Sequence, residues 1–121
     1  MVKKAVFLCV LALSAPLDAG ERLAMRVTPN MALEPALLTV RTIIESDADN
    51  RGLEVLAQSA DFYRSSSVQL NGASAPRLNV FEFKNLPMGT YEVTSVLVGS
   101  SGRRAIASRA FRVAHAPGSG R

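Results

Sequence analysis

The sequence predicts an all-β fold: a single antiparallel β-sandwich of about seven strands. Short runs in which apolar and polar residues alternate are separated by turn residues at a spacing of roughly 8–12 residues. No stretch keeps an amphipathic helical period over three turns. The chain has 121 residues, which is the size of one domain. We therefore expect two small sheets that enclose one core.

The first 19 residues have the layout of a secretory signal peptide. Lys3 and Lys4 precede the apolar run 5–13, which is too short to cross a bilayer because a span needs about 20 residues. A small, polar stretch follows, and we place cleavage after Ala19 with Leu17 at the −3 position. The alternative is a short buried element of the fold. Export predicts a periplasmic or extracellular protein, with no membrane span in the mature chain.

The composition beyond residue 19 argues against several kinds of site. The single cysteine, Cys9, lies in the leader, so the mature chain has no disulfide, thiol nucleophile or thiolate ligand. Without Lys3, Lys4 and Asp18, 12 of the 14 basic and nine of the ten acidic residues remain. Eleven of those 12 bases are arginines, mostly scattered as on a solvated face. We therefore expect neither a nucleic-acid partner nor a cofactor.

A broken first strand precedes two well-patterned ones. After a strand at 23–27, Pro29 and Pro35 place the chain on a sheet edge, because proline donates no hydrogen bond to a ladder. Further strands are predicted at 37–45 and from 53 to about 60. Leu38, Val40, Thr42 and Ile44 are expected on one face of the first of these strands, and Leu53, Val55 and Ala57 alternate with Glu54, Leu56 and Gln58 on the second.

The middle of the chain is less regular. Segment 61–67 combines aromatic, charged and hydroxyl side chains without clear alternation, so Val68 and Leu70 predict only a short strand. The Asn71-Gly72 dipeptide then indicates a turn. The next strand alternates Asn79, Phe81 and Phe83 with Val80 and Glu82.

The last two strands are predicted to form a hairpin around the Gly-Ser-Ser-Gly turn at 99–102. The final strand, 104–113, has Ile106 and Phe111 on opposite parities, so we expect a bulge near Ser108. Residues 114–121 lack alternation and are predicted to form a flexible tail, which gives a folded domain at 20–113. The inward side chains expected here are Tyr91, Val93, Ser95, Leu97, Phe111 and Val113.

The corner between these strands is the most specific motif in the chain. Leu86 is expected to plug the core edge, and Pro87 pre-sets φ for a turn. Gly89 supplies a backbone conformation that other residues reach only with strain. Tyr91 and Val93 then begin a half-buried strand.

The stretch from Phe81 to Val113 resembles the end of bacterial Ig-like, fibronectin type III-like and carboxypeptidase-regulatory-like domains. The residues that carry the resemblance are Phe81, Phe83, Leu86, Pro87, Gly89, Tyr91, Val93, Gly99 and Gly102. It implies an Ig-like sandwich whose broken first strand changes sheets and whose Tyr91 hydroxyl ties the preceding corner. It also implies an accessory or recognition module. The paired cysteines and core tryptophan of antibody-type domains are absent, and no catalytic residue comes with the resemblance.

The candidate partner-binding site is the segment 61–66. It consists of Asp61, Phe62, Tyr63, Arg64, Ser65 and Ser66. Tyrosine and arginine are enriched at interface hot spots, and hydroxyls add adaptable hydrogen bonds. The alternative is a strand crossover in which Phe62 or Tyr63 caps the core and Asp61 pairs with Arg64. Arg51 and Arg77 would extend the patch only if their loops lie at the same end.

Other polar residues offer no convincing site. His115 lies in the predicted tail and is expected to be a solvated side chain, because catalysis needs a rigidly held histidine. Glu82 and Glu92 are expected on neighbouring strands, facing solvent. One loop gathers Glu45, Asp47, Asp49 and Asn50. These oxygens suit either calcium or an ordinary turn, and the missing EF-hand spacing favours the turn and no metal site.

The sequence thus favours an exported, non-enzymatic binding module, monomeric, that recognises a protein or a surface glycan through exposed loops or an edge strand. The alternative function is a structural subunit of a cell-surface or periplasmic assembly. Such subunits can join by edge-strand pairing, and the proline-broken strand at 23–35 would be the exchangeable element.

Overall fold

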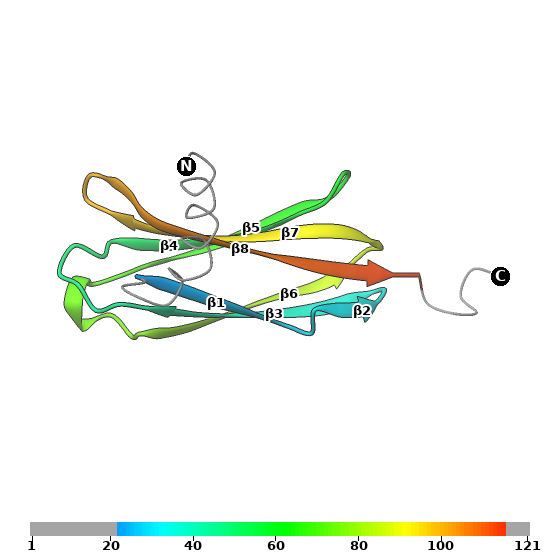
Figure 1. Cartoon of the computed structure of the whole chain (residues 1–121), viewed down its shortest axis with the longest axis horizontal. Helices are drawn as coiled ribbons and strands as arrows, with labels where there is room; N and C mark the ends of the chain where they lie inside the picture. The colour runs from blue at the N-terminus through cyan, green and yellow to red at the C-terminus, as the bar shows by residue number, and fades with distance from the viewer. Residues whose placement is uncertain (1–21, 116–121) are drawn as a thin grey trace, which may run out of the picture.

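Two β-sheets face each other in the computed structural model, which describes residues 22–115 (Figure 1). The predicted signal peptide (1–19) and residues 116–121 of the predicted tail lie outside the described residues. Between residues 22 and 115 the chain forms eight strands and one short 3-10 turn. The all-β class and the two-sheet arrangement predicted from the sequence are confirmed. Within the same residues, no helix is long and apolar enough to cross a membrane.

The sheets differ in size. The three-stranded sheet has the order β1 (Leu23–Thr28), β3 (Ala36–Ile44), β6 (Leu78–Leu86). The five-stranded sheet has the order β2 (Met31–Leu33), β8 (Gly102–Ala114), β7 (Gly89–Gly99), β4 (Gly52–Gln58), β5 (Tyr63–Gln69). The 3-10 turn η2 (Gly72–Ser74) lies between β5 and β6. Every strand pair is antiparallel except β2 with β8, which is parallel.

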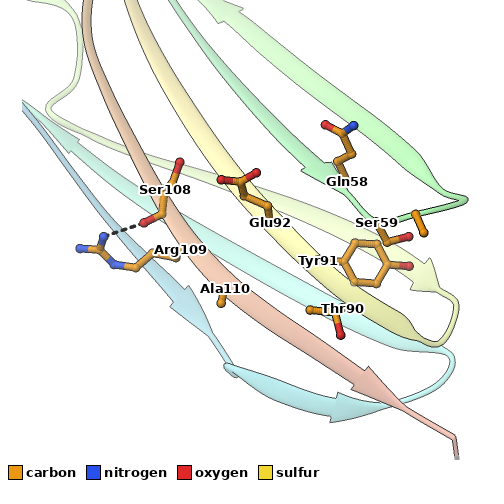
Figure 2. Close-up of a pocket in the computed structure, with 9 residues that line it drawn as sticks. Gln58, Ser59, Thr90, Tyr91, Glu92, Ser108, Arg109 and Ala110 are labelled. Atoms are coloured by element: carbon orange, nitrogen blue, oxygen red, sulfur yellow. Dashed lines mark hydrogen bonds between the residues drawn. The ribbon is translucent and has the colours of Figure 1, made fainter.

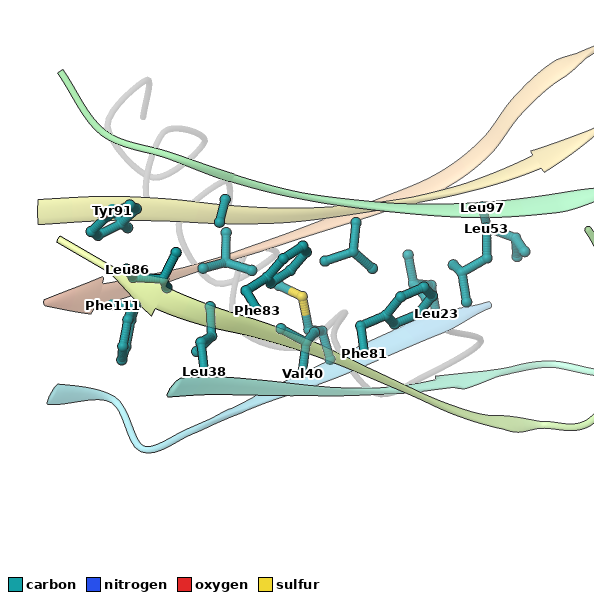
Figure 3. Close-up of a cluster of buried hydrophobic side chains, with 14 of the residues drawn as sticks. Leu23, Leu38, Val40, Leu53, Phe81, Phe83, Leu86, Tyr91, Leu97 and Phe111 are labelled. Carbon is teal, nitrogen blue, oxygen red and sulfur yellow. The ribbon is translucent and has the colours of Figure 1, made fainter. Parts of the chain in front are cut away.

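The core lies between the sheets and follows the predicted alternation (Figure 3). Each side chain predicted to face inward on β7 and β8 is at most 2% exposed, and so is each member of the sets Leu38 to Ile44 on β3 and Leu53 to Ala57 on β4 that alternation grouped on one face. Two of these are polar and find partners. Thr42 Oγ1 donates to the Asn79 carbonyl at 3.0 Å, and Ser95 Oγ lies 2.8 Å from Met25 Sδ. A buried hydroxyl without such a partner would destabilise the fold.

The first strand changes sheets, as the resemblance implied. β1 pairs with β3, and after Pro29 the chain crosses so that β2 pairs with β8 in the other sheet. β2 is only three residues long and lies between Pro29 and Pro35. The two prolines therefore bound the crossing segment, where few ladder hydrogen bonds are needed.

Two local predictions were wrong. β5 is a regular seven-residue strand rather than a short one after an irregular segment. The bulge lies at Arg104 instead of Ser108, because the register shifts between Leu97 opposite Ala105 and Val98 opposite Arg103. Ile106 needs no bulge to bring it inward, since it faces out of the sandwich and is 52% exposed.

Candidate functional site

The residues of the predicted site divide between a loop and a strand. Asp61 and Phe62 lie in the turn between β4 and β5, and the other four belong to β5 itself. β5 is the last strand of the five-stranded sheet and pairs only with β4 among residues 22–115. The site is therefore a sheet edge with its adjoining turn, rather than a loop surface.

Phe62 and Arg64 fix the turn to the body of the sandwich. Phe62 packs against the core and meets Tyr91 edge-on, with ring centroids 6.1 Å apart. The Arg64 guanidinium lies 5.1 Å above the Phe62 ring, and its Nη1 donates to the Lys84 carbonyl at 3.0 Å. The capping role foreseen for Phe62 is thus confirmed. The foreseen Asp61–Arg64 ion pair is not found among the described residues, because Arg64 turns towards β6.

Tyr63 and the serines leave β5 open to solvent. Tyr63 is 57% exposed, and Ser65, Ser66 and Ser67 are exposed as well. Tyr63, Ser65 and Ser67 line a shallow depression with Glu54 and Leu56 of β4. An exposed tyrosine beside hydroxyls offers both apolar contact area and hydrogen bonds to a partner.

The backbone of β5 presents a second, regular feature. Leu70 N donates to Arg51 O at 2.9 Å, and Ser59 N donates to Phe62 O at 2.8 Å, at the two ends of the β4–β5 pair. In an antiparallel ladder the bonded residues alternate. Residues 64, 66 and 68 therefore bond to β4. The N–H and C=O groups of residues 63, 65, 67 and 69 point to the open edge.

The other sheet edges are protected, whereas that of β5 is not. β6 carries Lys84 and, at Asn85, a left-handed residue with φ of 58° that breaks its regularity. β2 is short and bounded by prolines, and β1 lies beside β8 of the opposite sheet. Lysine, proline, irregularity and short length are the usual means of preventing edge-to-edge pairing. Within Tyr63–Gln69, β5 has none of these, and Arg64, which turns towards β6, is its one charged side chain.

Arg51 and Arg77 do not extend this site. Arg51 adjoins Gly52, which pairs with Gln69, whereas Tyr63 pairs with Gln58 at the other end of β4. Arg77 donates to the Ile44 carbonyl at 3.1 Å, next to the start of β6, while Arg64 reaches the far end of that strand. Both arginines therefore lie at the opposite end of the sandwich from the turn at residues 61–62.

The acidic loop is held by an arginine. Arg104 lies 3.0 Å from Asp47 Oδ2 and 3.3 Å from Asp49 Oδ2. Asp49 Oδ1 accepts hydrogen bonds from Ser100 Oγ at 2.7 Å and Ser100 N at 3.1 Å, and these bonds lower the pKa of Asp49. Asp47 Oδ1 accepts from Asp49 N at 2.7 Å, which is an Asx turn. These contacts favour the turn over a calcium loop, since Arg104 already balances both carboxylates.

The two glutamates are not neighbours, and the histidine has a partner. Glu82 lies on β6 and Glu92 on β7, which belong to different sheets, so the expectation of neighbouring strands was wrong. His115 follows β8 and its Nδ1 lies 2.6 Å from Glu34 Oε2. The histidine is half exposed, but it is tied to the sandwich and not free in a tail.

The corner closes as the resemblance implied. The Tyr91 hydroxyl donates to the Pro87 carbonyl at 2.7 Å, and burial raises the pKa of Tyr91. Gly89 has a positive φ of 158°. A side chain at this φ would be strained, which confirms the role expected of Gly89, and Asn85 adds a left-handed residue of a type that tolerates this conformation.

Three shallow depressions besides that at β5 involve residues of β7 or β8. The one with the largest volume, about 580 Å³, lies over the end of β4, the start of β7 and the middle of β8, around Tyr91 and Arg109 (Figure 2). Gln58, Thr90 and Glu92 line it from the outer face of the sheet. It is an open hollow whose titratable lining residues are Tyr91, Glu92 and Arg109. Within residues 22–115, no three His, Cys, Asp or Glu side chains are grouped as metal ligands would be.

Comparison with known proteins shows structural similarity to other β-rich proteins but assigns the chain to no family. No family model matches the chain, and no curated protein matches its sequence. A superoxide reductase (neelaredoxin) from Ignicoccus hospitalis has a similar structure, with a TM-score of 0.57 and 13% identity over 77% of this chain and 80% of that one.

Two further structures are similar to about the same degree. A family 76 glycoside hydrolase from a bovine Bacteroides thetaiotaomicron strain matches with a TM-score of 0.53 and 18% identity, over 75% of this chain but only 20% of the hydrolase. A myokine matches with a TM-score of 0.50 and 15% identity, over 75% of this chain and 93% of that one. Identities this low show a shared β fold alone, and one fold carries many functions.

Proposed function

We propose that this chain is an exported, non-enzymatic Ig-like binding module that pairs the open edge of β5 with an extended segment of a protein partner. The observation that supports this most strongly is the unprotected edge at Tyr63–Gln69, in a molecule whose other edges are short, irregular or covered. The corner hydrogen bond from Tyr91 to Pro87 and the sheet change after β1 support the Ig-like assignment. The signal-peptide layout of residues 1–19 supports export.

The chemistry of the edge favours a protein over a glycan. Four alternate residues, 63, 65, 67 and 69, each direct one donor and one acceptor outward with the spacing of a β-ladder. An incoming strand satisfies all of them at once, which is how strand addition gains affinity. Exposed Tyr63 would lie at one end of the added strand and contact alternate side chains of the partner.

A second copy of the chain is the alternative occupant. Two β5 strands could pair antiparallel and join the five-stranded sheets of two molecules, which would make the protein an assembly subunit. This route differs from the exchange of segment 23–35, because β1 and β2 are both already paired within the sandwich. Light scattering over a wide concentration range separates the two, since only self-pairing raises the mass of the purified chain.

Replacement of Ser67 by proline tests the edge directly. Ser67→Pro removes an N–H that points outward and leaves the hydrogen bonds from residues 66 and 68 to β4 in place. The matched control, Ser67→Ala, removes the hydroxyl but keeps the N–H. Extended peptides selected from a random library against the wild-type chain should bind Ser67→Pro about tenfold more weakly or worse, and Ser67→Ala almost unchanged.

The same measurement can contradict the proposal. Equal binding of the peptides to wild type and Ser67→Pro, with both proteins folded by thermal unfolding, would show that the β5 backbone is not the contact surface. A loss with Ser67→Ala as large as that with Ser67→Pro would assign binding to the hydroxyl and not to strand addition.

A further inference from the structure

The outer face of the three-stranded sheet carries exposed apolar side chains that the core does not use. Ile43 of β3 pairs with Leu78 of β6, and they are 48% and 54% exposed. Val80, on the same face of β6, is 50% exposed. Ala24 of β1 lies opposite Ile43 and completes the row. This arrangement forms a contiguous apolar strip on the solvent side of the sheet, of a kind that often marks a binding surface.

The next row across the same sheet contains two arginines. Arg26 of β1 lies directly opposite Arg41 of β3, and Arg41 lies opposite Val80. Like charges in directly opposed positions destabilise a sheet. Such a pair is tolerated more easily where an anion can bind between the two guanidinium groups.

No carboxylate of the described chain neutralises this pair. Between residues 22 and 115, neither Arg26 nor Arg41 has a carboxylate oxygen within 4.0 Å. The acidic residues on this face are Glu82, which lies opposite Thr39 in a different row, and Glu45, which is 4.0 Å from Arg22. The pair is therefore available to an external anion.

A third arginine comes from the other sheet. Arg109 of β8 extends towards β1, and one of its nitrogens donates to the Ser108 carbonyl at 2.8 Å (Figure 2). Arg26, Arg41 and Arg109 surround a depression of about 250 Å³. Its apolar lining comes from Ala24, Met25, Ile43 and Leu78. The depression thus combines several guanidinium donors with an apolar floor.

We propose that this depression binds an anionic group attached to an apolar chain, such as a phosphate or carboxylate of an amphiphile. The guanidinium groups match the geometry of phosphate and carboxylate oxygens, which they can bind in a bidentate manner. Ile43 and Leu78 offer the apolar chain a surface that is otherwise in contact with water. The three arginines have no carboxylate oxygen within 4.0 Å among residues 22–115, so charge complementarity favours an anionic ligand. The site is separate from the β5 edge, which lies in the other sheet.

The test uses decyl phosphate below its micelle concentration, with binding followed by NMR. We expect amide shifts at Ala24, Ile43 and Leu78, and roughly tenfold weaker binding by the double variant Arg26→Gln/Arg41→Gln. The matched control is Arg103→Gln, an exposed arginine on the other sheet, which should bind as wild type does. Added salt should weaken binding to the wild-type chain.

A second measurement keeps the test independent of folding. Removal of the opposed charges should leave the double variant at least as stable to heat as wild type, because repulsion across the sheet is lost. Vesicles of phosphatidylglycerol, compared with phosphatidylcholine, then identify the source of the anion. If the chain binds decyl phosphate but shows no preference between the two kinds of vesicle, the natural ligand is a free amphiphile. If it prefers phosphatidylglycerol vesicles and the double variant loses this preference, the ligand is a lipid headgroup.

Three results would overturn the proposal. Decyl phosphate could bind equally to wild type and the double variant, which would show that the arginines are not involved. Decanol could bind as tightly as decyl phosphate, which would reduce the effect to apolar adsorption. Inorganic phosphate could bind as tightly as decyl phosphate, which would exclude a role for the apolar strip.

Discussion

Tyr91 joins the corner to the core through both parts of its side chain. Its ring packs against Phe62 and Phe111, with centroids 6.1 and 6.0 Å away, while its hydroxyl donates to Pro87. Tyr91→Phe keeps the ring contacts and removes one largely buried hydrogen bond. We expect the free energy of unfolding to fall by about 1–1.5 kcal/mol in urea titrations. Stability unchanged from wild type would contradict the structural role of the hydroxyl.

Asp49 makes stability depend on pH at the other end of the sandwich. Hydrogen bonds from Ser100, followed by the nearby Arg104, lower the pKa of Asp49 below its ordinary value of 3.8. A carboxyl whose pKa is lowered by folding stabilises the native state above its unfolded pKa, and this stabilisation is lost as pH falls through the folded pKa. Asp49→Asn should therefore be less stable than wild type at neutral pH.

The difference between Asp49→Asn and wild type should shrink in acid. Thermal unfolding from pH 7 down to about pH 2 measures both curves. The matched control is Glu54→Gln, an exposed carboxyl on β4 for which the structure shows no ion pair among residues 22–115. A gap between Asp49→Asn and wild type that stays constant across the range would show that the charge of Asp49 is not the cause.

At the scale of elements, periodicity predicted most strands and failed on one for a physical reason. β3, β4 and β7 each bury one face, so their apolar residues alternate and their inward side chains could be read from the sequence. β5 exposes both faces, which removes the alternation on which such a prediction depends. The exposure of β5 explains why its length was not predicted, and it also leaves the strand free to pair with a strand of a partner.

The bulge was misplaced because Ile106 was assumed to be buried. Ile106 is exposed on the outer face of the sheet, so it need not lie on the same face as Phe111. The extra residue at the register shift is Arg104. Arg104 contacts Asp47 and Asp49, although these residues lie far from it along the chain.

The opposed arginines Arg26 and Arg41 on the three-stranded sheet were also missed, since their pairing depends on the register between β1 and β3. Sequence alternation separated Arg41 from the face of Val40 and Thr42 but could not place Arg26 opposite it.

On the scale of the whole molecule, the unequal sheets explain where open surfaces lie. Three strands cannot cover five, and β5 extends beyond the smaller sheet with Arg64 as its polar link to β6. β1 lies beside β8 on the other side of the sandwich, so that side is closed. A superoxide reductase, part of a glycoside hydrolase and a myokine have similar folds, so a function for this chain has to be inferred from its surface and not from its fold.

Amide hydrogen exchange along β5 tests the open edge most directly, because it needs no partner. In the isolated chain we expect slow exchange at residues 64, 66 and 68, whose N–H groups bond to β4, and fast exchange at 63, 65, 67 and 69. A bound extended peptide should then slow the second set. Uniformly slow exchange in the dilute isolated chain would show that the edge is already covered, and uniformly fast exchange would show that β5 is not a stable strand. Either pattern would contradict the proposed pairing surface.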